Sequence, residues 1–195
     1  MAYLEKMSEE LRRKVVSLPY RTGLWISESD TTGGDDADTA ELEALETIIT
    51  SFGEDFLKSE FVEEVMQETL DNMDLWDAWG EDLDSVLDDS KAVSEYLLSQ
   101  VPEKELHSYK QNLMDIATSI AIAYRENDSG SGQYLYRIAI YFDFYMKSLW
   151  ATLTTNQAPN LQHVLNISRD EKKALSLLAK ALDIDLKKAL REAMS

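Results

Sequence analysis

The sequence has no cysteine, only two histidines, and just 7 glycines and 3 prolines among its 195 residues. The absence of cysteine excludes disulfide bonds, thiolate metal sites and a cysteine nucleophile. His107 and His163 lie in no HExxH or Glu-x-x-His pattern, so nucleophilic triads and ferritin-like di-iron sites are disfavoured. P-loop, GxGxxG and GxSxG motifs are absent as well. The sequence therefore favours a non-enzymatic protein, with metal-assisted hydrolysis by clustered carboxylates as the one reaction class left open.

Long hydrophobic runs are also missing. Nowhere do about 18 apolar residues follow one another without a charge, so we expect no membrane span. The first 17 residues contain no apolar run of signal-peptide length. Together with the lack of cysteine, these features predict a cytoplasmic protein.

Basic residues are almost absent from one stretch of the chain. Residues 28–89 hold 22 acids and a single base, Lys58, whereas the remainder is close to neutral, although the whole chain carries −18. A local excess of acid on a near-neutral body indicates a cation or a basic protein partner. Direct nucleic-acid binding is disfavoured because phosphates would repel this stretch.

Helical periodicity determines the predicted fold class. The apolar residues between 106 and 123 alternate steps of three and four, which predicts a helix at about 102–126. No stretch alternates with period two over the length of a strand. We expect one all-α domain over residues 1–195, a compact helical bundle of about 7–9 helices.

The other helices follow from similar apolar stripes and capping signals. Ser168 and Glu171 match a capping box that opens a helix carrying Leu175, Leu178 and Leu182. The remaining helices are expected near residues 3–16, 19–28, 39–52, 55–71, 81–100, 133–153 and 185–194.

Two glycine-containing acidic loops interrupt these helices, at residues 27–38 and 126–132. Each lies between two predicted helices, and the residues that lead into the two loops are weakly alike. This likeness raises the possibility of two helix-loop-helix units related by a pseudo-twofold axis.

The first of these loops has the chemistry of a divalent-cation site. Five carboxylates lie within 12 residues: Asp30, Asp35, Asp36, Asp38 and Glu41. Ca²⁺ and Mg²⁺ prefer oxygen ligands of this kind. A standard EF-hand is excluded because its sixth position would be Asp35 instead of glycine. The alternative for Asp38 and Glu41 is a structural capping box, in which acids stabilise the start of a helix.

The same region resembles the tellurite-resistance TerB-like family. The resemblance rests on Leu24-Trp25-Ile26 running into Asp30, on a glycine-containing loop followed by Glu41, and on the tail 166–184. It covers about residues 18–53 and 106–184, and residues 54–105 have no counterpart. The resemblance implies a compact all-α fold and a role in stress or tellurite resistance. It also implies divalent-cation sites at four residues: Asp30, Glu41, Asp115 and Asp128.

Asp115 has a second interpretation. It lies between Met114 and Ile116 in an otherwise apolar part of its helix. An exposed helix position, or an ion pair with Lys110 or Arg137, would explain it without a metal.

Two tryptophans lie in the later part of the acidic stretch. Residues 71–89 combine Trp76 and Trp79 with eight acids and no base. Such a mixture is typical of surfaces that dock basic, amphipathic partners. We favour the alternative, in which both tryptophans anchor a helix on the core and the acids form its solvated face.

The sequence thus supports two functions. The first is a regulatory or scaffold module that binds Ca²⁺ or Mg²⁺ through the acidic loop. The second is an interaction protein whose acidic face docks a basic partner without metal. The oligomeric state stays open.

Overall fold

Every regular element that the structure describes is helical. The computed structural model describes residues 2–29, 45–50, 59–123 and 169–184, and in these ranges no strand occurs. Six α-helices have defined bounds within them: α1 (Glu9–Ser27), α3 (Glu60–Asp71), α4 (Trp76–Gly80), α5 (Val86–Leu97), α6 (Glu103–Ala123) and α8 (Arg169–Ala181). Two 3-10 helices, η1 (Leu4–Lys6) and η2 (Met73–Leu75), accompany them, and residues 45–50 are helical too. The predicted all-α bundle is confirmed.

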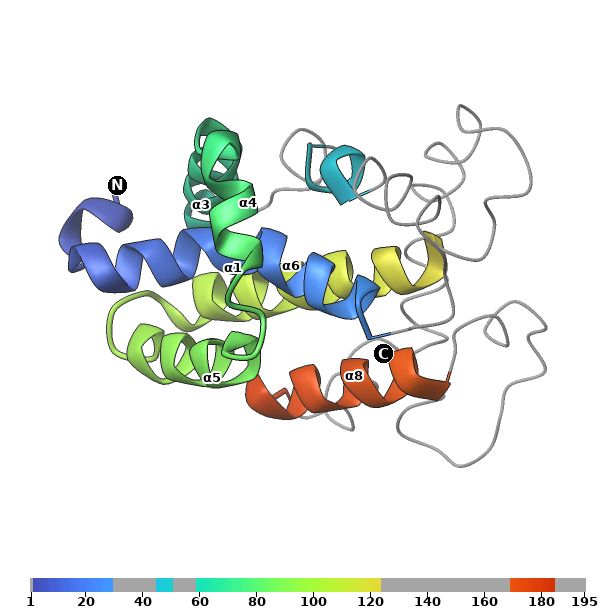
Figure 1. Ribbon diagram of the computed structural model, residues 1–195. Coiled ribbons are helices and arrows are strands. Elements are labelled where there is room, and N and C mark those ends of the chain that lie inside the picture. The colour runs from blue at the N-terminus through green and yellow to red at the C-terminus, as the bar shows by residue number, and fades with distance from the viewer. Residues whose placement is uncertain (1, 30–44, 51–58, 124–168, 185–195) are drawn as a thin grey trace.

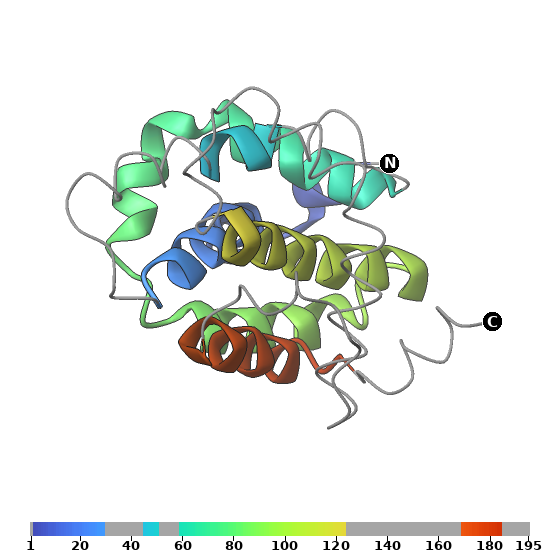
Figure 2. The ribbon, with the colours of Figure 1, turned by 90° about the vertical axis from the view of Figure 1, so that its right-hand side faces the viewer.

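The helices stack in three layers (Figures 1 and 2). Helices α1 and α6 lie side by side in the middle and pack more extensively than any other pair of helices in the described ranges. Helices α3 and α4 lie on one side of this pair, and α5 and α8 lie on the other. None of the helices in the described ranges is long and apolar enough to cross a membrane.

Helix α1 is the central element, because residues 15–23 are buried without interruption. A helix surrounded by neighbours needs apolar or small side chains on all sides. Gly23 supplies the smallest: a Cβ at this position would meet Leu45 Cδ1 and would lie 3.3 Å from Ile116 Cγ2. The glycine therefore allows both the helical segment 45–50 and α6 to approach α1 closely.

The predicted break at Pro19 is wrong. We expected separate helices near 3–16 and 19–28, but α1 runs from Glu9 through Pro19 to Ser27. Only a 3-10 turn, η1, precedes it, and Ser8 caps its start. Proline in a helix interior leaves the carbonyl four residues earlier without its donor, and tertiary packing compensates for that loss here.

The predicted helix at 81–100 is present but shorter, as α5 (Val86–Leu97), and the helical turns before it were not predicted. The chain forms η2 and the short α4 first, and α5 begins only at Val86. The turn between them is held by Arg21, which donates to the backbone carbonyl oxygen of Asp82. A contact with a residue 61 positions earlier has no local signature, so periodicity did not indicate it.

The remaining helix predictions agree with the structure where it describes them. Helix α6 matches the predicted helix at 102–126, and α3 begins at Glu60, where Ser59 caps it. Leu175, Leu178 and Leu182 are fully buried, as expected for the helix after the capping box. The predicted helices at 133–153 and 185–194 and both glycine loops beyond Ser29 lie outside the described residues, and so does the pseudo-twofold relation.

Candidate functional site

Of the predicted cation ligands, only Asp115 lies in the part of the chain that the structure describes. The others fall outside it: Asp30, Asp35, Asp36, Asp38, Glu41 and Asp128. Among the described residues, no group of three or more His, Asp or Glu side chains is arranged to hold a metal ion. The cation site therefore stays a prediction from the sequence.

Asp115 lies on α6 and accepts a 2.6 Å hydrogen bond from Gln111 Nε2, one helical turn earlier. The residue is only partly exposed, and burial of its carboxyl raises the pKa to about 8, although the bond from Gln111 acts to lower it. The ion pair proposed with Lys110 is not found, and Arg137 lies outside the described residues. At neutral pH this carboxyl is mostly protonated, so on its own it is a poor cation ligand.

A groove of about 900 Å³ separates the first half of α1 from the α3–η2–α4 segment. Its lining falls into three groups, the α1 wall (Glu9, Arg12, Arg13), the α3 wall (Glu64, Gln67, Glu68, Asp71, Asn72) and the apolar floor (Val16, Leu75, Ala78, Trp79). The α1 wall carries two arginines and the α3 wall carries three carboxylates. A groove with such walls and an apolar floor suits the binding of an amphipathic segment.

Two sets of hydrogen bonds hold the walls of the groove. Arg12 donates from Nε and Nη2 to the two carboxylate oxygens of Glu68, at 2.7 and 2.8 Å. This bidentate bond raises the pKa of Arg12. Glu64 accepts the backbone N–H groups of Tyr3 and Leu4 at 2.7 and 3.0 Å. The α1 and α3 walls are thus fixed relative to each other.

The tryptophans anchor η2 and α4 on the core, as we favoured from the sequence. Trp76 and Trp79 are 7% and 5% exposed. Trp76 stacks on Tyr20, with ring centroids 4.5 Å apart, and donates to the carbonyl oxygen of Thr69 at 3.1 Å. The edge of Trp79 reaches the groove floor. The anchoring fixes the segment that carries the exposed acids.

A smaller pocket of about 180 Å³ adjoins the groove through Arg13, Ala78 and Trp79, which line both. Its inner end is an ion pair between Arg21 Nη1 and Asp89 Oδ2 at 2.8 Å, with side chains 5% and 10% exposed. Both charges are buried, so the pair joins α1 to α5 where solvent does not weaken it.

Two further side chains complete this ion pair. Lys14 Nζ lies 3.0 Å from the second carboxylate oxygen of Asp89, and Ser85 donates to Asp89 at 3.0 Å. Burial alone would raise the pKa of Asp89, but hydrogen bonds from Arg21, Lys14 and Ser85 outweigh it and lower the pKa. Sequence reasoning missed this cluster, although a lone arginine within the buried run 15–23 is a detectable signal that a carboxylate partner exists.

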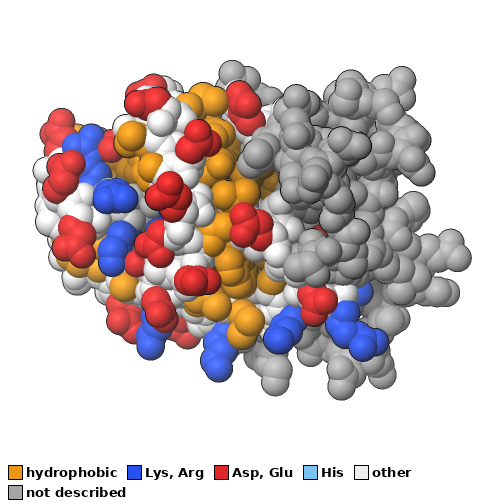
Figure 3. Space-filling view, in the orientation of Figure 1, with side chains coloured by type: hydrophobic (Ala, Val, Ile, Leu, Met, Phe, Trp, Pro, Cys, Tyr) orange, Lys and Arg blue, Asp and Glu red, His pale blue; other side chains and the backbone are white. Residues whose placement is uncertain are grey.

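The outer surface next to the groove is acidic. Residues 59–89 contain 12 acids and no base. Nine of the acids are exposed: Glu60, Glu63, Asp71, Asp74, Asp77, Glu81, Asp82, Asp84 and Asp88. We call these nine residues the acidic surface. Met73 and Leu75, 41% and 42% exposed, lie among them in η2. Figure 3 shows carboxylates with hydrophobic side chains between them over this half of the molecule.

No family model matches this chain, and neither the curated proteins nor the solved structures contain a match to it.

Proposed function

We propose that this chain is a helical interaction module that docks a basic, amphipathic segment of a partner protein in the groove between α1, α3 and α4. The observation that carries the proposal is the acidic surface beside this groove, which lacks any base between residues 59 and 89. An excess of carboxylates beside a groove with an apolar floor favours a ligand with positive charge and an apolar face.

The groove and the acidic surface would contribute differently to binding. Carboxylates such as Asp74 and Asp77 are exposed, so they contribute mainly to the association rate and to partner choice. Affinity would come from covering apolar surface at Leu75, Met73 and the edge of Trp79. A methionine suits this role because its flexible thioether adapts to differently shaped partners.

The experiment uses a synthetic amphipathic peptide with leucine at helical spacing and lysine elsewhere, and a second peptide with glutamate in place of lysine. Calorimetric titration should show binding of the lysine peptide alone, with affinity that falls as salt rises. Asp74→Lys with Asp77→Lys (D74K/D77K) should weaken this binding at least tenfold, or about 1.4 kcal/mol. Met73→Ser with Leu75→Ser should weaken it without changing the salt dependence.

The matched control is Glu95→Lys with Glu103→Lys (E95K/E103K), which alters net charge equally but lies on α5 and α6, away from the groove. This control should keep the affinity within about twofold, a difference of about 0.4 kcal/mol. Equal losses in both double variants would mean that net charge alone attracts the peptide, and the proposal would fail.

A second candidate function is divalent-cation binding by the acidic loop. It is supported by the five carboxylates between Asp30 and Glu41 and by the resemblance to the TerB-like family, from which a role in stress or tellurite resistance would also follow. Titration of chelator-treated protein with Ca²⁺ and with Mg²⁺ should release heat, and Asp35→Asn with Asp36→Asn should abolish it. No heat and no thermal shift at millimolar metal would rule this function out.

A further inference from the structure

Helix α8 presents a basic face to solvent. Arg169, Lys173 and Lys180 are exposed and lie on one side of the helix, because their spacings of four and seven residues correspond to one and two turns. Leu177, 40% exposed, lies between the two lysines. Lys172 is partly exposed next to them. We call Arg169, Lys172, Lys173, Leu177 and Lys180 the basic face.

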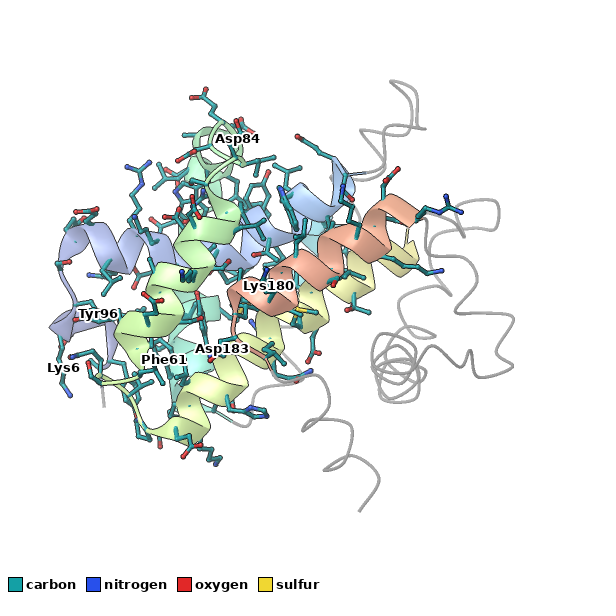
Figure 4. All side chains as sticks on the ribbon, turned by 90° about the horizontal axis from the view of Figure 1, so that it is seen from below. Lys6, Phe61, Asp84, Tyr96, Lys180 and Asp183 are labelled. Atoms are coloured by element: carbon teal, nitrogen blue, oxygen red, sulfur yellow. The ribbon has the colours of Figure 1, made fainter. Side chains whose placement is uncertain are left out.

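The cations of the basic face have no ion-pair partner within the described residues. Two exposed acids, Asp170 and Asp183, lie near the ends of the same helix, so its outer side keeps a positive balance. Seen from below, α8 is the element nearest the viewer, with Lys180 along it (Figure 4). Figure 3 shows the corresponding row of basic side chains along the lower edge of the molecule.

The basic face and the part of the acidic surface on α3, η2 and α4 occupy different sides of the fold, whereas Asp88 lies on α5 in the same layer as α8. Helices α3 and α4 lie above the central α1–α6 pair, and α8 lies below it (Figures 1 and 2). Contact between the basic face and the part of the acidic surface on α3, η2 and α4, which includes Met73 and Leu75, is therefore excluded within one copy by the layer between them. Two copies of the chain can bring these surfaces together. The surfaces carry opposite charge, and each includes exposed apolar side chains, Leu177 on the basic face and Met73 with Leu75 among the acids of the acidic surface.

We propose that the basic face of one copy docks on the acidic surface of a second copy. This inference rests on the proposed function, since it names a second copy of the chain as a ligand of the same acidic surface. The contact joins two different surfaces, so it does not close as a twofold dimer and instead adds copies head to tail. The net charge of −18 opposes association, so the assembly should be weak and concentration-dependent.

Sedimentation velocity of the full chain over a wide concentration range tests the proposal. The wild-type sedimentation coefficient should rise with concentration. Lys173→Glu with Lys180→Glu (K173E/K180E) should remain monomeric, and so should D74K/D77K. Circular dichroism checks that the variants fold, which we expect because all four positions are exposed.

Charge reversal on both surfaces provides the decisive control. The chain that combines K173E/K180E with D74K/D77K has the net charge of the wild type, and charges of opposite sign still face each other at the four exchanged positions. It should associate again, and an equimolar mixture of the two double variants should associate as well. E95K/E103K should associate at least as well as the wild type.

Two outcomes would overturn the inference: a wild-type chain that stays monomeric at every concentration, or association that K173E/K180E leaves unchanged. Neither outcome affects binding of the lysine peptide, which is measured on the dilute monomer. A monomeric chain that still binds this peptide would therefore refute the self-association and leave the proposed function standing.

Discussion

The hydroxyl of Tyr109 on α6 donates a 2.9 Å hydrogen bond to the carbonyl oxygen of Val15 on α1. In a regular helix this carbonyl would accept from the residue four positions later, which is Pro19 and has no N–H group. The tyrosine thus replaces the donor that the proline lacks. The bond explains how a proline is accommodated within the buried run 15–23 of α1.

Tyr109→Phe should lower the free energy of unfolding by about 1–3 kcal/mol, because it leaves a buried carbonyl without any donor. Urea unfolding monitored by circular dichroism measures this loss. On a Pro19→Ala background, where the helix supplies its own N–H, the same substitution should cost clearly less. Equal costs on both backgrounds would show that the tyrosine does not compensate for the proline.

Asp89→Asn should lower the free energy of unfolding by about 3–5 kcal/mol, because it leaves the buried Arg21 guanidinium without its charged partner. Replacing both members, with Arg21→Met and Asp89→Leu, should cost less than Asp89→Asn alone, since no buried charge remains unpaired. Thermal and urea unfolding compare the two variants. A double variant that is less stable than the single one would argue against this account.

Glu105 should make the fold sensitive to acid. It accepts hydrogen bonds from the Ser59 hydroxyl at 2.5 Å and from the Phe61 N–H at 3.0 Å, at the start of α3. Burial would raise the pKa of Glu105, but these two bonds outweigh it and lower the pKa. A carboxyl with a lowered folded pKa stabilises the protein above its unfolded pKa, and this contribution is lost as pH falls through the folded value.

Glu105→Gln should therefore be less stable than the wild type at neutral pH, and the difference should shrink below the ordinary carboxyl pKa. Unfolding midpoints measured from pH 7 down to pH 3 check this. Glu103→Gln, an exposed position two residues before Glu105, is the matched control and should follow the wild-type curve. A difference that does not depend on pH would point to lost shape complementarity instead of lost charge.

Asp115 should have the opposite pH dependence. Its folded pKa is raised to about 8 by burial, so the folded state holds a proton that the unfolded state releases near pH 4. The contribution of Asp115 to the free energy of unfolding therefore falls as pH rises from about 4 through about 8. Asp115→Asn should raise the free energy of unfolding most at pH 8 and little at pH 4. If Asp115 were a cation ligand, the same variant would instead reduce metal-dependent stabilisation in the calcium titration.

Local patterns predicted those parts of the fold in which a helix has one apolar side. Helix α8 follows the stripe of Leu175, Leu178 and Leu182, and α6 follows the three-and-four spacing that begins at Leu106. The burial of Trp76 and Trp79, three residues apart, follows from the same principle. In α8 a single buried side imposes this periodicity, whereas residues 116–121 of the central α6 are buried without interruption and only its large apolar side chains keep the spacing.

Features that depend on distant partners could not be predicted in this way. The continuity of α1 depends on Tyr109, 94 residues away from Val15, and the end of α4 depends on Arg21. The groove has no sequence motif, since it arises from the way α3 and α4 lie against α1. The charge count did locate the stretch that carries the acidic surface, because so many carboxylates with no base between residues 59 and 89 cannot all be buried.

The packing of Leu45 on Gly23 has a consequence for the segment between them. The chain leaves α1 after Ser27, and the Leu45 side chain packs against Gly23 of the same helix, so the described residues on both sides of 30–44 are anchored at α1. Core packing therefore already holds these ends together. A cation that binds the carboxylates between them would not have to provide the free energy of closing this loop. Leu45→Ala would release one end, and any affinity of that segment for a cation should fall with it, although no ligand atom is changed.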